Sequence, residues 1–251
     1  MKVFADGYEH RSEGLINFPK DTALRATTMP PESATHPARN NLHMLRAIVD
    51  YVAEPGESIL DPFGGVGSIC AVAPNNPLIL IEIEPKFAEL ARQTSEMNGG
   101  NAIVLEGDCR RLLPIPCAHA IFSPPFAGDI KDSTWKPKET VEDLDSYSGQ
   151  SSKNTSLGKF NQFQFGFLMK RVYKLLGESV TKTLTIILRD TMRQGERQML
   201  SLPAIKGLNE AGFELAEWHK RYCPPSSRRS YAQSKGWKTV DDEDIIIFRK
   251  A

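Results

Sequence analysis

Residues 58–68 read Ser-Ile-Leu-Asp-Pro-Phe-Gly-Gly-Val-Gly-Ser, a short apolar strand that leads directly into a glycine-rich turn. Glycines permit a sharp bend and let the backbone approach a ligand closely. We expect a helix from Ser68 to about Ala73 to follow, so that strand, turn and helix form one ligand-binding unit. A purely structural tight turn and a nicotinamide-binding turn are the two alternatives.

Apolar runs on either side of this unit alternate between strand and helix patterns. We expect strands at residues 58–61, 78–82, 102–105, 119–122, 183–188, 213–218 and 244–248, and helices at residues 42–52, 85–97, 163–176 and 200–211. This alternation predicts an α/β fold with a Rossmann-like, doubly wound, mostly parallel sheet of seven strands. In such sheets the ligand site lies at the carboxyl ends of the strands.

The distribution of polar and apolar residues predicts how the chain is organised. The 251 residues, 40% of them hydrophobic, suit a single domain over residues 36–251, preceded by a polar, irregular N-terminal arm over residues 1–35. Long polar stretches near 127–161 and 219–240 are candidate recognition insertions. No apolar run reaches membrane-spanning length and no signal-peptide pattern is present, so we expect a cytoplasmic protein with no membrane partner.

Composition narrows the chemistry further. Lys+Arg and Asp+Glu number 31 each, so net charge does not indicate a nucleic-acid binder, and any basic surface must be local. The four cysteines form no CxxC pair, and the five histidines are scattered along the chain. We therefore expect reduced thiols and no metal site. The oligomeric state is not predicted by these features.

Carboxylates follow three successive strands of the predicted sheet. Asp61 would repel the pyrophosphate of a nicotinamide cofactor, and Cys70 stands where that fingerprint has its third glycine. A carboxylate suits a cation instead, and S-adenosylmethionine carries an ammonium and a sulfonium group but no phosphate. Glu82 can accept hydrogen bonds from both ribose hydroxyls, and Asp108 can accept one from the adenine amino group.

These positions define a predicted S-adenosylmethionine site. Glu84 is a weaker alternative to Glu82, because it also fits a solvated turn, and Asp108 also fits an ordinary turn aspartate. The order of a carboxylate with glycines, a second carboxylate and a Gly-Asp pair is more specific than any one of them. The predicted cofactor-binding residues are Asp61, Pro62, Phe63, Gly64, Gly65, Gly67, Ser68, Glu82, Ile83, Asp108 and Cys109.

The fourth strand ends in Ser123-Pro124-Pro125-Phe126, four residues that we predict to be catalytic. An amino nitrogen conjugated with a base ring attacks poorly, because its lone pair is delocalised. The Ser123 side chain and a proline carbonyl can accept its two hydrogens and direct the lone pair toward a methyl group. Phe126 would stack on the base. A rigid loop with no chemical role is the alternative, and no covalent nucleophile is required.

Both motifs resemble those of the DNA amino-methyltransferase family, which carries Asp-Pro-Phe-x-Gly-x-Gly and [Asp/Asn/Ser]-Pro-Pro-[Tyr/Phe]. The resemblance extends from His36-Pro37-Ala38-Arg39-Asn40 to the strand at residues 243–250. It implies a DNA methyltransferase that acts on the exocyclic amino group of a flipped base. Ser-Pro-Pro members mostly modify cytosine N4, and adenine N6 is the second candidate. The cofactor motif here precedes the catalytic one, however, whereas Ser-Pro-Pro members commonly have the reverse order.

Other classes share parts of this pattern. An RNA amino-methyltransferase has the same catalytic logic but normally carries a separate RNA-binding module. A protein-glutamine methyltransferase has Asn at the position of Ser123, and a non-catalytic nucleic-acid-binding module would not need both motifs. The sequence does not predict the recognition site, the strandedness of the substrate, or whether a restriction enzyme accompanies the protein.

Basic and aromatic residues alternate without any acidic residue between residues 219 and 238. Positive charge suits phosphate contacts, and aromatic rings suit stacking on an extruded base. A solvated loop is the alternative reading. The predicted nucleic-acid-binding residues are Lys220, Arg221, Arg228, Arg229, Lys235 and Lys238. The stretch 127–161 has mixed charge and is either a recognition loop or disordered.

Overall fold

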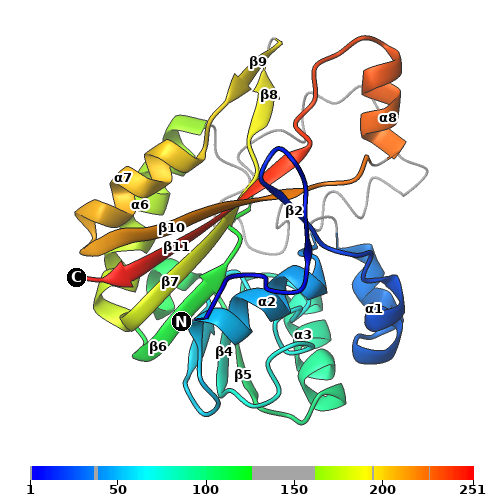
Figure 1. The fold of residues 1–251 in the computed structure, drawn as a ribbon. Helices are drawn as coiled ribbons and strands as arrows, with labels where there is room; N and C mark the ends of the chain where they lie inside the picture. The colour runs from blue at the N-terminus through cyan, green and yellow to red at the C-terminus, as the bar shows by residue number, and fades with distance from the viewer. Residues whose placement is uncertain (1, 37–38, 126–161, 194, 226) are drawn as a thin grey trace.

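The computed structural model describes residues 2–36, 39–125, 162–193, 195–225 and 227–251. A nine-stranded sheet runs through it in the order β1-β2-β10-β11-β7-β6-β3-β4-β5 (Figure 1). Its strands are β1 (Glu9–His10), β2 (Leu15–Asn17), β3 (Ile59–Asp61), β4 (Leu78–Glu82), β5 (Ala102–Glu106), β6 (Cys117–Phe122), β7 (Val180–Leu188), β10 (Phe213–Tyr222) and β11 (Asp242–Lys250). A separate hairpin pairs β8 (Thr191–Arg193) with β9 (Glu196–Gln198).

The strands from β5 to β7 are parallel to one another, whereas β11 is antiparallel to both of its neighbours, β7 and β10. The predicted doubly wound, mostly parallel α/β sheet is therefore confirmed. The predicted number of seven strands is too small. All seven expected strands are present. The two additional strands are β2, which pairs in parallel with β10 at residues 220–221, and β1, which pairs antiparallel with β2.

Helices cover both faces of the sheet and enclose a core on each (Figure 1). The first core contains helix residues such as Ile48 and Phe87, and the second contains Met169 and Leu208. The helices are α1 (Thr22–Thr28), the 3-10 turn η1 (Pro31–Thr35), α2 (Leu42–Val52), α3 (Pro85–Met97), α4 (Cys109–Leu112), α6 (Gln162–Ser179), α7 (Ser201–Glu210) and α8 (Ser227–Ser234).

Local sequence signals explain where the helices next to the site begin. The side chain of Asn41 accepts a hydrogen bond from the Met44 N–H and caps α2. Pro85 occupies the first turn of α3, where its missing N–H costs no hydrogen bond. The expected bounds of α2, α3 and β4 match the structure. These elements hold the glycine-rich turn between them.

Several expectations about local structure are wrong. Residues 1–35 are not irregular throughout, because they form β1, β2, α1 and η1 and bury Ile16 in the first core. The expected helix from Ser68 to Ala73 is a series of tight turns that ends before Pro74. The polar stretch after residue 219 begins inside β10, which continues to Tyr222. The predicted insertion at 127–161 lies outside the described residues.

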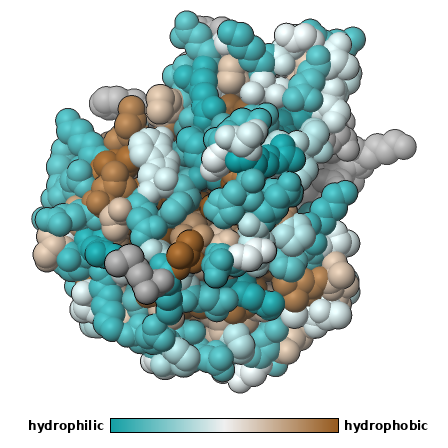
Figure 2. Space-filling model, viewed as in Figure 1, coloured by the Kyte–Doolittle hydropathy of each residue, from teal (hydrophilic) through white to brown (hydrophobic). Residues whose placement is uncertain are grey.

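The face of the molecule shown in Figure 2 is mainly hydrophilic, with separate small groups of hydrophobic residues. No helix within the described ranges is long and apolar enough to cross a membrane.

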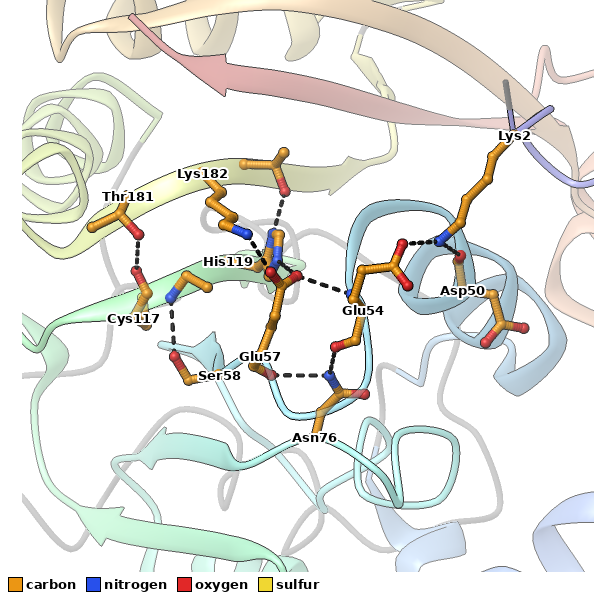
Figure 3. Close-up of polar contacts among 12 residues, drawn as sticks. Lys2, Asp50, Glu54, Glu57, Ser58, Asn76, Cys117, His119, Thr181 and Lys182 are labelled. Carbon is orange, nitrogen blue, oxygen red and sulfur yellow. Dashed lines mark hydrogen bonds and ion pairs between the residues drawn. The ribbon is translucent and has the colours of Figure 1, made fainter.

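A polar network ties the strands together at the edge of the sheet where β3, β6 and β7 begin (Figure 3). The buried ring of His119 is bonded through Nε2 to Glu57 at 2.8 Å and through Nδ1 to Thr183 at 2.7 Å. Glu57 also pairs with Lys182 and accepts from the Glu54 N–H at 2.9 Å. The Glu54 N–H, followed by the Lys182 and His119 contacts, lowers the pKa of Glu57 to about 2.

We predict that Glu57→Gln destabilises the fold by about 1–3 kcal/mol, because it weakens hydrogen bonds that involve a charged group. The effect should be visible in denaturant unfolding at pH 7. Since folding lowers the pKa of Glu57, its contribution is complete above its ordinary pKa of 4.5 and is lost as the pH falls toward about 2. Glu54→Gln is the control, because it removes only an exposed pair with Lys2. Equal stability of the two variants would contradict this role.

Candidate active site

A cavity of about 300 Å³ opens at the carboxyl ends of the parallel strands. It brings together residues that lie up to 64 positions apart in the sequence, from the ends of β3, β4, β5 and β6. From the predicted cofactor-binding and catalytic sets, its lining contains Asp61, Pro62, Phe63, Gly64, Gly65, Ser68, Glu82, Ile83, Asp108, Cys109, Ser123, Pro124 and Pro125, and from the predicted nucleic-acid-binding set it contains Arg221. The structure thus places the two motifs at one site.

Glu82 is held at the end of β4 by the glycine-rich turn. Its Oε2 atom accepts a hydrogen bond from the Gly65 N–H at 2.7 Å, and its Oε1 atom accepts one from the Glu84 N–H at 2.9 Å. The side chain is nearly buried, and this burial raises its pKa although the N–H groups oppose the shift. An acceptor-only carboxylate fixed at a cavity wall fits a pair of ribose hydroxyls.

Asp61 contributes a second carboxylate from the end of β3. Its Oδ1 atom accepts a hydrogen bond from the Phe63 N–H at 2.9 Å. The residue is partly open to the cavity, but protein surrounds its carboxyl group elsewhere, and this desolvation raises its pKa to about 7. The charge of Glu82 acts in the same direction. A cationic ligand beside Asp61 would reverse the shift, because it favours the ionised form.

The glycines of the turn have different structural roles. A side chain at Gly64 would place its Cβ atom 2.9 Å from Leu80 of β4. At Gly67, where φ is +75°, a Cβ atom would come within 2.9 Å of the Ala91 backbone in α3. Gly67 was predicted to bind the cofactor, yet it does not line the cavity, and its position instead allows the turn to pack on α3.

Asp108 and Cys109 follow β5 at the same edge. The Asp108 side chain caps α4 by accepting from the Arg110 N–H at 2.9 Å, and it forms an ion pair with the Arg110 guanidinium at 2.6 Å. Burial raises the pKa of Cys109 to about 12, so its thiol is neutral at physiological pH. Asp108 lines the cavity, but in the structure its carboxylate is already bound to Arg110.

The predicted catalytic loop follows β6 and lines the cavity. Ser123 is partly exposed, and Pro124 is buried behind it. The ring of Phe63 lies against Phe122, with 5.8 Å between ring centroids, so the turn after β3 packs directly on the strand that carries Ser123. The fourth predicted residue, Phe126, lies outside the described residues.

Several cavity residues were not predicted to be there. His36, Arg39 and Asn40 line it from the segment before α2, and the His36 ring packs edge-on against Phe87 with centroids 4.5 Å apart. These three residues belong to the stretch 36–40 that resembles the family. The resemblance did not indicate that they would line the cavity. Glu84, Arg189 and Glu243 also line the cavity; Arg189 follows β7, and Glu243 lies in β11.

The predicted nucleic-acid-binding residues do not form one basic surface. Lys220 and Arg221 lie in β10 and pair with Asp244 and Glu243 of the neighbouring strand β11, both at 2.6 Å. Arg229 donates hydrogen bonds to the carbonyl oxygens of Val240, Cys223 and Pro224. Lys235 and Lys238 are exposed and follow α8, whereas the side chain of Arg228 lies outside the described parts.

Known proteins share this fold. TrmN from Thermus thermophilus matches with a TM-score of 0.50 at 14% identity, over 88% of this chain and 52% of its own, so this chain spans about half of that protein. Magnesium protoporphyrin IX methyltransferase from Synechocystis PCC 6803, solved with bound SAM, matches with a TM-score of 0.50 at 12% identity, over 93% of this chain and 98% of its own. A SAM-dependent methyltransferase from Methanosarcina mazei matches with a TM-score of 0.52 at 12% identity, over 81% of this chain and 96% of its own. No curated protein sequence matches the chain.

The chain therefore has the fold of methyltransferases, one of which was solved with bound SAM. A family model described as DNA methylase matches residues 9–93 and confirms the resemblance to the DNA amino-methyltransferase family. The matched region contains the glycine-rich turn and Glu82 and ends before Ser123. The cavity residues fit the cofactor chemically, because fixed carboxylates face a ligand that has hydroxyl groups and positive charge.

We predict that Glu82→Ala weakens binding of S-adenosylhomocysteine about tenfold to a hundredfold, because two hydroxyls lose a charged acceptor. Calorimetry measures the affinity, and thermal unfolding verifies that the variant is folded. Glu106→Ala is the matched control, since Glu106 ends the neighbouring strand β5 with an exposed side chain outside the cavity. Wild-type affinity in folded Glu82→Ala would show that the ribose site is elsewhere.

Binding of S-adenosylmethionine should also depend on pH through Asp61. Its pKa of about 7 in the free protein means that the carboxylate protonates as the pH falls from 8 to 6, and the cation then loses its partner. We expect affinity to fall about tenfold over that range, and to stay flat in Asp61→Asn, which should bind weakly throughout. Calorimetry at pH 6, 7 and 8 gives both curves. A wild-type affinity that is flat, or rises at low pH, contradicts the prediction.

Proposed function

We propose that the protein methylates the exocyclic amino group of a DNA base that is flipped into the cavity, and that this base is cytosine, modified at N4. The observation that carries the proposal is the position of Ser123-Pro124-Pro125 in the same cavity as Asp61 and Glu82. The match to a DNA methylase model supports DNA as the substrate. Because a base in a duplex cannot reach a cavity at a sheet edge, it must leave the stack.

The loop after β6 can prepare the amino group for attack. The Ser123 hydroxyl and the carbonyl oxygen of a neighbouring proline accept the two amino hydrogens, which localises the nitrogen lone pair. Bound S-adenosylmethionine supplies an electrophilic methyl group. Two successive prolines restrict the backbone, so the acceptors are positioned before the base arrives. Methyl transfer to nitrogen needs no covalent intermediate and hence no thiolate nucleophile. The neutral thiol of Cys109 agrees with such a transfer.

The choice of cytosine depends on Ser123. A hydroxyl is shorter than the side chains of aspartate and asparagine and a weaker acceptor than a carboxylate, and Ser-Pro-Pro members of the resembling family mostly modify cytosine. Adenine N6 in DNA and an amino group in RNA are the alternative acceptors. The three acceptors differ in the methylated nucleoside or in the polymer that carries it. Nucleosides from digested DNA and from digested RNA therefore separate them.

We predict N4-methylcytosine after incubation of unmethylated DNA with tritiated S-adenosylmethionine and chromatography of the nucleosides. Ser123→Ala should reduce turnover about tenfold to a hundredfold, with cofactor affinity near wild type, because the hydroxyl binds the base. Ser58→Ala is the control, since it removes a hydroxyl bonded to the backbone at the other edge of the sheet. Label in 5-methylcytosine would contradict the mechanism, and label in N6-methyladenine would contradict the choice of base.

DNA binding should depend on the exposed lysines of the 219–238 stretch. The guanidinium of Arg229 is bonded to backbone carbonyl oxygens, and the two cations of β10 are paired with acids. We therefore place the phosphate contacts at the exposed Lys235 and Lys238. Alanine at both should flatten the slope of log affinity against log salt by about 1.4–1.8, as each lost contact removes about 0.7–0.9. Alanine at Lys2 and Lys170 is the control pair. An unchanged slope would mean that this stretch does not contact phosphate.

A further inference from the structure

The cavity has a charged wall that the mechanism above does not use. Arg221 of β10 and Glu243 of β11 are directly opposite one another in the antiparallel pair. Arg221 Nε donates to Glu243 Oε2 at 2.6 Å, and the side chains are only 12% and 10% exposed. Both residues line the cavity that contains Ser123. A buried ion pair is costly to desolvate, so its position at a ligand-binding wall asks for an explanation.

The strand order separates this pair from the cofactor residues. From β4, which carries Glu82, to β10 the sheet crosses five strand spacings, which corresponds to about 24 Å. Ser123 follows β6, between these two ends, and Arg189 follows β7 next to it. The Arg221–Glu243 pair therefore lies beyond Ser123, on the side away from Glu82. That side of the cavity is the one left for the target base.

The bonding of Arg221 determines which donors remain for a ligand. Glu243 engages the guanidinium at Nε, and within the described parts of the chain Arg221 makes no hydrogen bond through its two terminal nitrogens. These nitrogens form a flat face with two adjacent donors. Glu243 also balances the positive charge. The pair therefore suits a neutral ring edge with two neighbouring acceptors better than it suits a phosphate.

We propose that Arg221, held in place by Glu243, reads the edge of the target base and selects cytosine. This inference rests on the proposed function. When the amino group of cytosine is at Ser123, the neighbouring N3 and O2 atoms are two adjacent acceptors for the terminal nitrogens of Arg221. Adenine has N1 beside its amino group, but the next ring position is a C–H. Arg221 is thus a specificity-determining residue that contacts the base through hydrogen bonds to its Watson–Crick edge.

The closing experiment measures kcat/KM for methylation of unmethylated DNA, the ratio of N4-methylcytosine to N6-methyladenine, and the affinity for S-adenosylhomocysteine. Arg221→Gln should lower kcat/KM for cytosine about tenfold to a hundredfold, which is the range for loss of a two-point base contact, with cofactor affinity unchanged. Arg221→Lys keeps the ion pair with Glu243 but has no flat two-donor face, so it should also be impaired. This second variant preserves the test if Arg221→Gln does not fold.

Arg197→Gln is the matched control, because it removes ion pairs to Asp190 and to Asp242 of β11, both outside the cavity, and should leave kcat/KM near wild type. Wild-type cytosine methylation by a folded Arg221→Gln or Arg221→Lys protein overturns the inference and leaves the proposed function intact. A wild-type protein that makes only N6-methyladenine overturns the inference, because the second acceptor would then be missing. A wild-type protein that methylates no DNA overturns the proposed function and this inference with it.

Discussion

The parallel hydrogen bonding of β5, β4, β3 and β6 is the constraint on which the site depends. Because these strands run in the same direction, their carboxyl ends meet at one edge, and residues that end each strand or closely follow it line a common cavity. Asp61, Glu82, Asp108 and Ser123 are brought together in this way. Gly64 and Gly67 let the connecting turn pack closely on β4 and on α3, where a Cβ atom would come within 2.9 Å of Leu80 or Ala91.

The positive charges of β10 are balanced by acidic residues of the neighbouring strand β11. β10 carries Lys220 and Arg221, and β11 places Asp244 and Glu243 opposite them, so the sheet neutralises a stretch that looks basic in the sequence. At the cofactor end, Asp61 and Glu82 form no ion pair within the described part of the chain, whereas Asp108 pairs with Arg110. The cavity therefore has acidic groups at one end and a paired arginine at the other, which suits a cationic donor and a neutral acceptor.

Sequence patterns predicted the elements that have strong periodicity or clear end signals, and they failed where pairing is decided by distant residues. The bounds of α2, α3 and β4 follow from apolar spacing, Asn41 and Pro85. The short strand β2 has too few residues to show alternation, and it exists because β10 offers an edge. The acids that pair with β10 come 22 to 24 residues later, so a local count of charge could not show them. The cavity positions of Asp61, Glu82 and Ser123 could be predicted because each directly follows or ends a strand. Their chemical roles remain predictions.

A crystal structure with bound S-adenosylhomocysteine tests the central claim most directly, namely that one edge of the sheet holds the cofactor and presents it to the Ser123 loop. The account predicts that the ribose hydroxyls bind Glu82, that the ammonium group lies beside Asp61, and that the sulfur atom faces Ser123. The Arg221–Glu243 wall should remain free of the ligand. A ligand bound elsewhere, or one whose ribose lies at Arg221 with its sulfur turned away from Ser123, would contradict the account.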